Sequence, residues 1–143
     1  MSQASMNQDT MEQYVKEHGD VVQHERGYVL FVYNTVQMAL VSDVKHDRMR
    51  LISPIARYEE VDAEHRDAVM EANFHSALDA RYAVSNGVLY SAYIHPVSPL
   101  TEAQLRSAME QVGNLVLTYG DQYSSGALVY GGVAGENDEA TRQ

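Results

Sequence analysis

Residues 81–119 read RYAVSNGVLYSAYIHPVSPLTEAQLRSAMEQVGNLVLTY and predict a β-hairpin followed by a helix. The Asn86-Gly87 pair between two apolar runs supplies the positive φ angles that a type I′ turn requires. A two-residue turn also fixes the pairing of the strands, because a slip by one residue would turn every side chain to the other face. The expected opposed pairs are Val84 with Leu89 and Tyr82 with Ser91. Both faces of this hairpin are apolar, so we expect a helix on one face and a second subunit on the other.

The helix after the hairpin has the strongest helical pattern of the chain. Thr101 and Gln104 form a capping box, in which each side chain bonds a backbone N–H at the start of the helix. Gly120 provides a C-terminal cap. Gly113 lies inside the helix, where glycine costs about 1 kcal/mol relative to alanine, so we expect a neighbouring element to pack closely there. The apolar stripe at helical spacing consists of Leu105, Met109, Val112 and Val116.

Another helix is predicted before the hairpin, over residues 62–75. Asp62 is a favourable N-cap residue. Asn73 lies near the other end, where asparagine tolerates the left-handed conformation that closes a helix. The expected buried side consists of Val61, Ala68, Val69, Ala72 and Phe74.

The N-terminal part predicts a weak amphipathic helix and then strands. Asp9 or Thr10 would cap the helix, Gly19 would end it, and Val21–His24 is a candidate short strand. The expected longer strands are residues 28–33, 36–41 and 48–55. Pro54 has no N–H to donate, which favours a sheet edge or the end of its strand. The sequence therefore predicts an α+β fold: an antiparallel sheet with helices packed on one side, in the order α-β-β-β-α-β-β-α.

The composition bounds the class of protein. The chain has 143 residues, which is the size of one domain. We expect a flexible N-terminus over residues 1–8, a single domain over residues 9–130 and a flexible tail over residues 131–143. The sequence has no cysteine, which excludes disulfides, thiolate metal sites and a cysteine nucleophile.

The charge bounds the possible partners. The formal net charge is −10, which disfavours binding to nucleic acid or to an anionic membrane surface. No apolar run approaches the roughly 20 residues that a membrane span needs. The polar start of the chain lacks the features of a secretion signal, so we expect a cytoplasmic protein.

The residue types that do chemistry show no catalytic arrangement. The six histidines lack metal-ligand spacing. The acidic side chains of the helix over residues 62–75 are typical of a solvated surface rather than of an acid–base pair. The ten tyrosines suit either ordinary sheet packing or an interface. We therefore expect no catalytic residue, no metal and no cofactor.

Four segments together resemble a known group of proteins. They are RMRLISPIARYEE (residues 48–60), AVMEANF (68–74), RYAVSNGVLYSAYI (81–94) and LTEAQLRSAMEQVGNLVLTYG (100–120). This order is similar to the YbjN-like and type III secretion chaperone-like (Tir chaperone-like) proteins. The resemblance implies a small, acidic, dimeric bacterial protein without enzymatic activity. In those families the secretion chaperones hold an extended stretch of another protein on apolar patches, and the YbjN-like proteins are proposed regulators.

These observations lead to one main hypothesis and two alternatives. The main hypothesis is a non-enzymatic homodimeric protein-binding module, chaperone-like or regulatory, that binds an extended segment of a partner protein. The alternatives are a small-ligand-binding sensory regulator and an adaptor or immunity-type protein that neutralises a basic partner. The candidate interface residues are Tyr90, Ala92 and Ile94 in the hairpin and Leu105, Met109, Val112, Gly113 and Val116 in the last helix.

Overall fold

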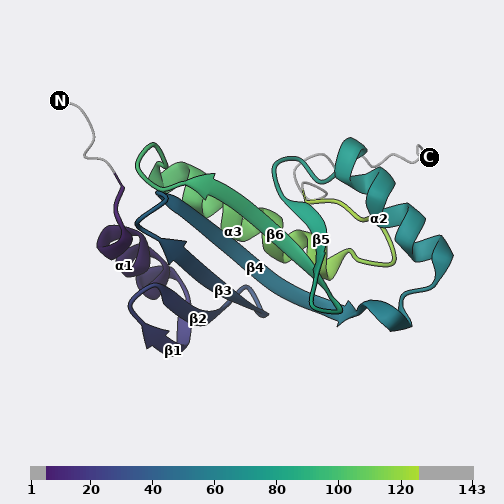
Figure 1. Ribbon diagram of the computed structural model, residues 1–143, viewed down its shortest axis with the longest axis horizontal. Coiled ribbons are helices and arrows are strands. Elements are labelled where there is room, and N and C mark those ends of the chain that lie inside the picture. Colours follow the sequence, from purple (N-terminus) through teal and green to yellow (C-terminus); the bar gives the residue numbers. More distant parts are fainter. Residues whose placement is uncertain (1–5, 126–143) are drawn as a thin grey trace.

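A computed structural model describes residues 6–125 and has the α+β fold that the sequence predicts. The elements are α1 (Gln8–His18), β1 (Asp20–Glu25), β2 (Tyr28–Tyr33), β3 (Val36–Asp43), β4 (Arg48–Arg57), the short 3-10 helix η1 (Tyr58–Glu60), α2 (Ala63–His75), β5 (Arg81–Ser85), β6 (Val88–Pro96) and α3 (Glu102–Leu117). The candidate short strand is present as β1 and lies at the edge of the sheet (Figure 1).

The strands of the described part of the chain form a six-stranded antiparallel sheet in the spatial order β1-β2-β3-β4-β6-β5. The chain leaves the sheet after β4, forms α2 and returns through β5 at the far edge. Strand β6 then fills the place between β5 and β4. The longest pairing joins β4 and β6, from Arg48 opposite Pro96 to Arg57 opposite Val88. In Figure 1 these two strands cross the middle of the molecule, with α3 behind them.

Two of the three helices cover the same face of the sheet, which we call the inner face. Helix α3 packs across β3, β4 and β6, and α1 packs on β1 and β2 and touches α3. Helix α2 lies at the opposite end of the molecule, against β5 (Figure 1). The largest fully buried side chains are Met11, Phe31, Met38, Leu40, Met49, Leu51, Leu89, Leu105, Met109 and Leu115. The core lies between the inner face, α1 and α3, and Val69 and Ala72 of α2 extend it at one end.

The hairpin of β5 and β6 is built as predicted. Asn86 and Gly87 both have positive φ angles, of 49° and 77°. The pairs Val84–Leu89 and Tyr82–Ser91 are confirmed. The register places Leu89, Ser91 and Tyr93 on the inner face, where Ser91 Oγ donates to the Val112 carbonyl at 3.0 Å.

Pro54 lies within β4, which continues to Arg57. The pairing of β3 with β4 ends where Ala39 lies opposite Ile52. Beyond that point the flank of β4 toward β3 is an edge, so the missing N–H of Pro54 breaks no hydrogen bond there. A register shift between Pro54 and Ala56 interrupts the pairing on the other flank, with β6. Pro54 therefore lies inside a central strand, at a point where one flank has no partner, and it marks neither an edge strand nor the end of β4.

Helix α2 begins as predicted and differs from the prediction at its other end. The Asp62 side chain accepts from the His65 N–H at 2.9 Å, which confirms the N-cap. Asn73 does not close the helix, which continues to His75. The side chain of Asn73 instead forms hydrogen bonds with the backbone of Tyr82. Phe74 was predicted to be buried and is 85% exposed. It follows the buried Ala72 by two residues, which is about 200° around the helix, so it points to the opposite side.

Helix α1 packs on its own domain. Met11 and Val15 are fully buried, and Met6, before the helix, also belongs to the core. The N-cap is Asn7 rather than Asp9 or Thr10, because Asn7 and Thr10 form a capping box. The ordered domain therefore extends further toward the N-terminus than the predicted limit at residue 9.

Helix α3 has the capping box of Thr101 and Gln104 that the sequence predicts. It ends at Leu117, and Gly120 follows with a φ angle of 85°. A Cβ on Gly113 would lie 3.8 Å from both Met38 Cε and Val36 Cγ2. The close neighbour expected at Gly113 is thus β3 of the same chain, and the spacing is that of ordinary van der Waals contact.

The segment after α3 is tied to the end of α2. The Ser76 hydroxyl donates to the Tyr123 carbonyl at 2.6 Å, and the Ser125 N–H donates to the Ser76 carbonyl at 3.2 Å. Asn114 of α3 donates to the Ser125 carbonyl at 2.8 Å. The predicted domain limit at residue 130 and the predicted tail over residues 131–143 lie outside the described residues.

Candidate functional site: the outer face of the sheet

The sheet has a second face, away from α1 and α3, which we call the outer face. Side chains alternate along each strand, so the residues next to the core residues point to it. The pairing aligns Leu30, Ala39, Ile52 and Ala92 in one row across four strands, and Tyr28, Val41, Arg50 and Ile94 in the next. The apolar members of the outer face are Tyr28, Leu30, Val32, Ala39, Val41, Ile52, Val88, Tyr90, Ala92 and Ile94.

The outer face is largely apolar and lies outside the helix-covered core. Ile94 is 60% exposed, and Leu30, Val41, Ile52 and Tyr90 are only half-buried. A contiguous apolar surface of this kind marks a site of protein or ligand contact in most soluble proteins. Among the described residues no helix packs on this face, and Figure 1 shows its strands uncovered at the front of the molecule.

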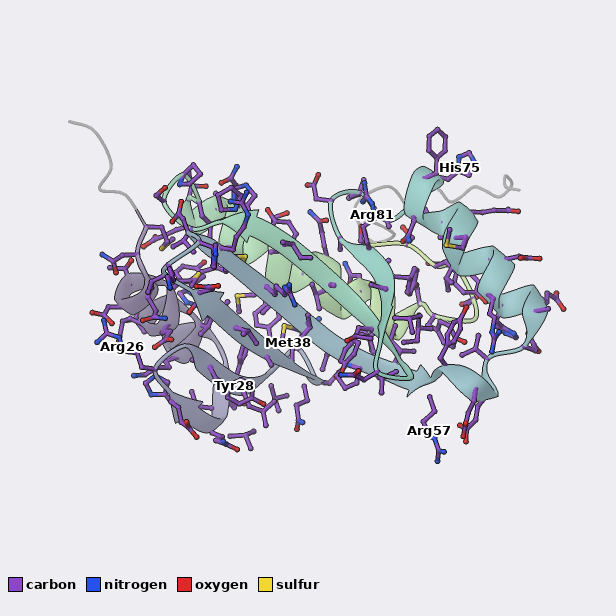
Figure 2. The ribbon with its side chains drawn as sticks, in the orientation of Figure 1. Arg26, Tyr28, Met38, Arg57, His75 and Arg81 are labelled. Atoms are coloured by element: carbon purple, nitrogen blue, oxygen red, sulfur yellow. The ribbon has the colours of Figure 1, made fainter. Side chains whose placement is uncertain are left out.

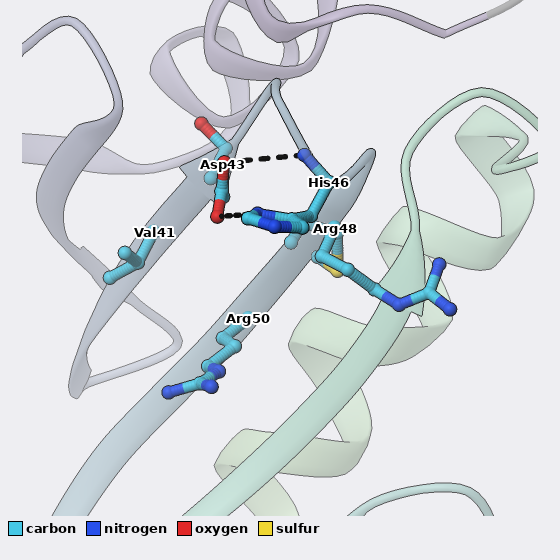
Figure 3. A pocket seen from close by; sticks show the side chains of 7 residues that line it. Val41, Asp43, His46, Arg48 and Arg50 are labelled. Carbon is cyan, nitrogen blue, oxygen red and sulfur yellow. Dashed lines mark hydrogen bonds and ion pairs between the residues drawn. The ribbon is translucent and has the colours of Figure 1, made fainter.

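Charged residues stand at one end of the outer face, around the turn between β3 and β4. Asp43 accepts from the His46 ring at 2.7 Å and from the backbone N–H of Lys45 at 3.1 Å. The hydrogen bond from His46 lowers the pKa of the Asp43 carboxyl from its ordinary value. Figure 3 shows this pair beside an open pocket of about 460 Å³ that is lined by Val41, Ser42, Asp43, His46, Arg48, Met49 and Arg50.

Two arginines of β4 flank this pocket, and their side chains run in different directions. Arg48 extends over β6, and Arg50 extends to the other side of β4 (Figure 3). Arg48 has one recorded hydrogen bond, to the Asp47 carbonyl at 3.4 Å. Within residues 6–125, the side chain of Arg50 has neither an ion pair nor a hydrogen bond. The outer face therefore combines apolar side chains with guanidinium groups that are free to bind a carboxylate.

The structure divides the predicted interface residues into two groups. Tyr90, Ala92 and Ile94 lie on the outer face, as their alternation with Leu89, Ser91 and Tyr93 requires, and Ala92 is only 8% exposed there. Leu105, Met109, Val112 and Gly113 are buried under the inner face. Side chains sealed in the core cannot contact a partner without rearrangement, so their place in an interface is corrected. Val116 is partly buried and packs against the same core.

A second exposed apolar patch lies on α2 and was missed by sequence reasoning. Met70 is 70% exposed and Phe74 is 85% exposed, and the two lie one helical turn apart. Figure 2 shows His75, the residue after Phe74, at the C-terminal end of α2, at the top of the view. The spacing of four residues between Met70 and Phe74 was a visible signal, but the neighbouring Val69 and Ala72 obscured which side of the helix faces the sheet.

Within residues 6–125, no group of three or more histidine, aspartate or glutamate side chains has a geometry that would hold a metal ion. None of the helices described is both long and apolar enough to cross a bilayer.

Solved structures share this fold. One is the HopA1–SchA chaperone–effector complex, with a TM-score of 0.57, 12% identity and coverage of 76% of this chain and 88% of that chain. Another is the ExsC–ExsE complex, with a TM-score of 0.57, 11% identity and coverage of 76% and 86%. The third is the Yersinia pestis type III secretion chaperone SycH in complex with a stable fragment of YscM2, with a TM-score of 0.57, 12% identity and coverage of 79% and 98%.

These similarities concern the fold. No protein-family model and no curated protein sequence matches the chain. The protein therefore has the type III secretion chaperone fold, and the predicted resemblance to that class is confirmed at the level of structure. The YbjN-like relationship stays a prediction.

Proposed function

We propose that this protein is a non-enzymatic, chaperone-like binding module that holds a segment of another protein on its outer face. The observation that carries the proposal is the half-exposed apolar outer face of a sheet whose inner face is already filled by α1 and α3. The structures of the same fold support it, because they include a chaperone–effector complex and a secretion chaperone bound to a protein fragment. We also propose that the protein acts in the cytoplasm, as the sequence predicts.

A bound segment would bury apolar area that the chain itself leaves in water. Each square ångström of apolar surface removed from water contributes about 25 cal/mol. Ile94 is exposed and Ile52 and Tyr90 are partly exposed on β6 and β4. Ala39 and Ala92 lie between these larger side chains and are largely covered by their neighbours, at 7% and 8% exposed. The outer face is thus suited to a polypeptide segment that lies across β3, β4 and β6.

Site-specific photo-crosslinking in the native host tests the binding proposal. A photoreactive amino acid at Ile94 should crosslink to another polypeptide, and mass spectrometry would identify the segment bound. The control carries the same amino acid at Leu117, which is 55% exposed at the end of α3. Equal yields from both positions, or none from Ile94, would contradict the proposal.

We also propose that the protein is a homodimer and that the apolar patch of α2, Met70 and Phe74, lies in the subunit interface. Exposing two large apolar side chains to water, one turn apart on one helix, is unfavourable in a monomer. A self-complementary contact between two subunits would bury both of them. Sedimentation velocity should give a dimer for the wild type and a monomer for the double variant Met70→Glu, Phe74→Glu. A wild-type monomer at micromolar concentration would refute this part of the proposal and leave the binding proposal standing.

A further inference from the structure

We propose that Arg50 makes the outer face selective for a partner segment that carries an aspartate or glutamate between apolar residues. This inference rests on the proposed function and adds the chemistry of the partner to it. It starts from the position of one cation in an acidic protein, where 20 acidic residues face 10 lysines and arginines.

Arg50 lies among apolar residues of the outer face, in the row next to the charged end where Asp43 lies opposite Arg48. It pairs with Val41 of β3 on one side and with Ile94 of β6 on the other. The next row of the same face consists of Ala39, Ile52 and Ala92. A segment laid across the centre of the outer face would therefore cover the guanidinium group as well as the apolar side chains around it.

Within residues 6–125, no carboxylate pairs with Arg50. The salt bridges recorded for arginines in residues 6–125 involve Arg26, Arg57 and Arg106. Two acids of the outer face stand at this end. Asp43 lies opposite Arg48 and is already bonded to His46. Glu25 is in the row of Arg50 but three strands away, on β1 opposite Tyr28. Arg81, on the same face of β5, is held by the carbonyls of Leu78 and Ala80. In a chain with twice as many acids as bases, an arginine without an acid on a candidate binding face is a specific feature.

The free guanidinium group decides which segments can bind tightly. Covering a charged group with apolar atoms removes it from water and costs several kcal/mol unless an opposite charge and hydrogen bonds replace that water. A carboxylate meets this need, because it accepts two parallel N–H bonds from an arginine. A purely apolar segment leaves the charge unpaired, and a segment with lysine at that place meets direct repulsion. Arg50 therefore both attracts one class of segment and rejects the others.

The experiment compares three versions of the full chain: wild type, Arg50→Glu and Arg57→Glu. Arg57 is the matched control, because it is an exposed arginine of the same strand that projects from its end (Figure 2). Peptides are selected on the wild type from a display library of random sequences. Dissociation constants of selected peptides are then measured by fluorescence anisotropy, together with versions in which each acidic residue is replaced by its amide or by lysine. Thermal melts establish that all three proteins are folded.

The expected result is a charge swap. Selected peptides should share an acidic residue flanked by apolar ones, and Arg50→Glu should weaken their binding at least tenfold, which is about 1.4 kcal/mol. The lysine versions should recover affinity for Arg50→Glu, and Arg57→Glu should bind like the wild type. Equal binding of acidic and amide peptides by the wild type would overturn the inference.

Further outcomes separate this inference from the proposed function. If the peptides lose affinity for the variant Ile52→Asp but not for Arg50→Glu, the result supports the binding face and contradicts the inference of an acidic partner. Peptides indifferent to both changes would reject the proposed function as well. Tight binding of a synthetic peptide of residues 126–143 would assign the face to that segment of the same chain. A change of sedimentation coefficient in Arg50→Glu would assign the face to a second copy. Either result would overturn the inference.

Discussion

The side chain of Asn73 holds both backbone groups of Tyr82: Nδ2 donates to the Tyr82 carbonyl at 3.0 Å, and Oδ1 accepts from the Tyr82 N–H at 2.7 Å. This contact joins the last turn of α2 to the outer edge of β5. The Tyr82 hydroxyl in turn donates to the Leu115 carbonyl of α3 at 3.0 Å. Tyr82 thus links α2, the sheet and α3, and the edge of β5 at this point is closed to pairing with another strand.

Replacing Asn73 by alanine should destabilise the protein. The change removes two hydrogen bonds and leaves the N–H and carbonyl of the buried Tyr82 without partners, at a cost of about 1–3 kcal/mol. Urea unfolding followed by circular dichroism measures the difference. The control is Glu71→Ala, an exposed residue of the same helix, for which the change should stay within about 0.5 kcal/mol. Equal stability of the two variants would show that the contact does not hold α2 in place.

The two groups of predicted interface residues should respond differently to truncation. Met109 is fully buried and Ile94 is 60% exposed. Met109→Ala should lower the free energy of unfolding by about 2–5 kcal/mol because it opens a cavity in the core. Ile94→Ala should change stability by less than about 0.5 kcal/mol and weaken partner binding instead. Chemical denaturation checks the first effect, and crosslinking yield in the native host checks the second.

Two glycines should respond to alanine in opposite directions. A Cβ on Gly19 would lie 2.7 Å from Phe31 Cδ2 and 3.1 Å from the Val32 carbonyl oxygen, so Gly19→Ala forces α1 away from β2. Overpacking of this kind destabilises by about 1–3 kcal/mol. Gly113→Ala meets only ordinary contacts at 3.8 Å and should stabilise α3 by up to about 1 kcal/mol. Thermal unfolding of both variants beside the wild type gives the signs, and a destabilised Gly113→Ala would mean that β3 and α3 cannot adjust.

Ionisation of Asp62, the N-cap residue of α2, should make the stability of the protein depend on pH in the acidic range. Hydrogen bonds from the backbone N–H and the ring of His65 lower the pKa of the Asp62 carboxyl below its ordinary value of 3.8. The unfolded chain thus binds the proton more tightly than the folded one. The contribution of Asp62 is then fully present above the ordinary pKa and is lost as pH falls through the lower folded pKa. Asp62→Asn, which keeps the cap but cannot ionise, should lose less melting temperature than the wild type between pH 6 and pH 2.5. Parallel melting curves for the two proteins would contradict this.

Local sequence signals were sufficient for much of the fold. The turn at Asn86-Gly87 and the capping box of Thr101 and Gln104 involve residues close in the chain, and both are confirmed. The N-cap at Asp62 is local as well. Errors arose where a residue's role depends on distant partners, as with Asn73, whose contact lies on another element, and with Phe74, whose helix meets the sheet only along one narrow side.

The candidate site shows the same division. Alternation along β6 identified Tyr90, Ala92 and Ile94 as one face of a strand, but it could not tell whether a helix covers that face. The stripe on α3 was found correctly and assigned to the wrong neighbour, because an apolar stripe packs equally well on its own sheet or on another subunit. Arg50 could not be identified from the sequence, because its apolar neighbours belong to β3 and β6, which are brought beside it only by the fold.

The sequence by itself determined which segments become strands and helices, where the tight turn falls and how β5 pairs with β6, because these properties follow from backbone angles and from periods of two and 3.6 residues. Only the tertiary structure decided which face of the sheet is filled and which is left open. That choice depends on where α1 and α3 come to rest after the strands assemble, and packing between segments far apart in the chain leaves no periodic trace in either one.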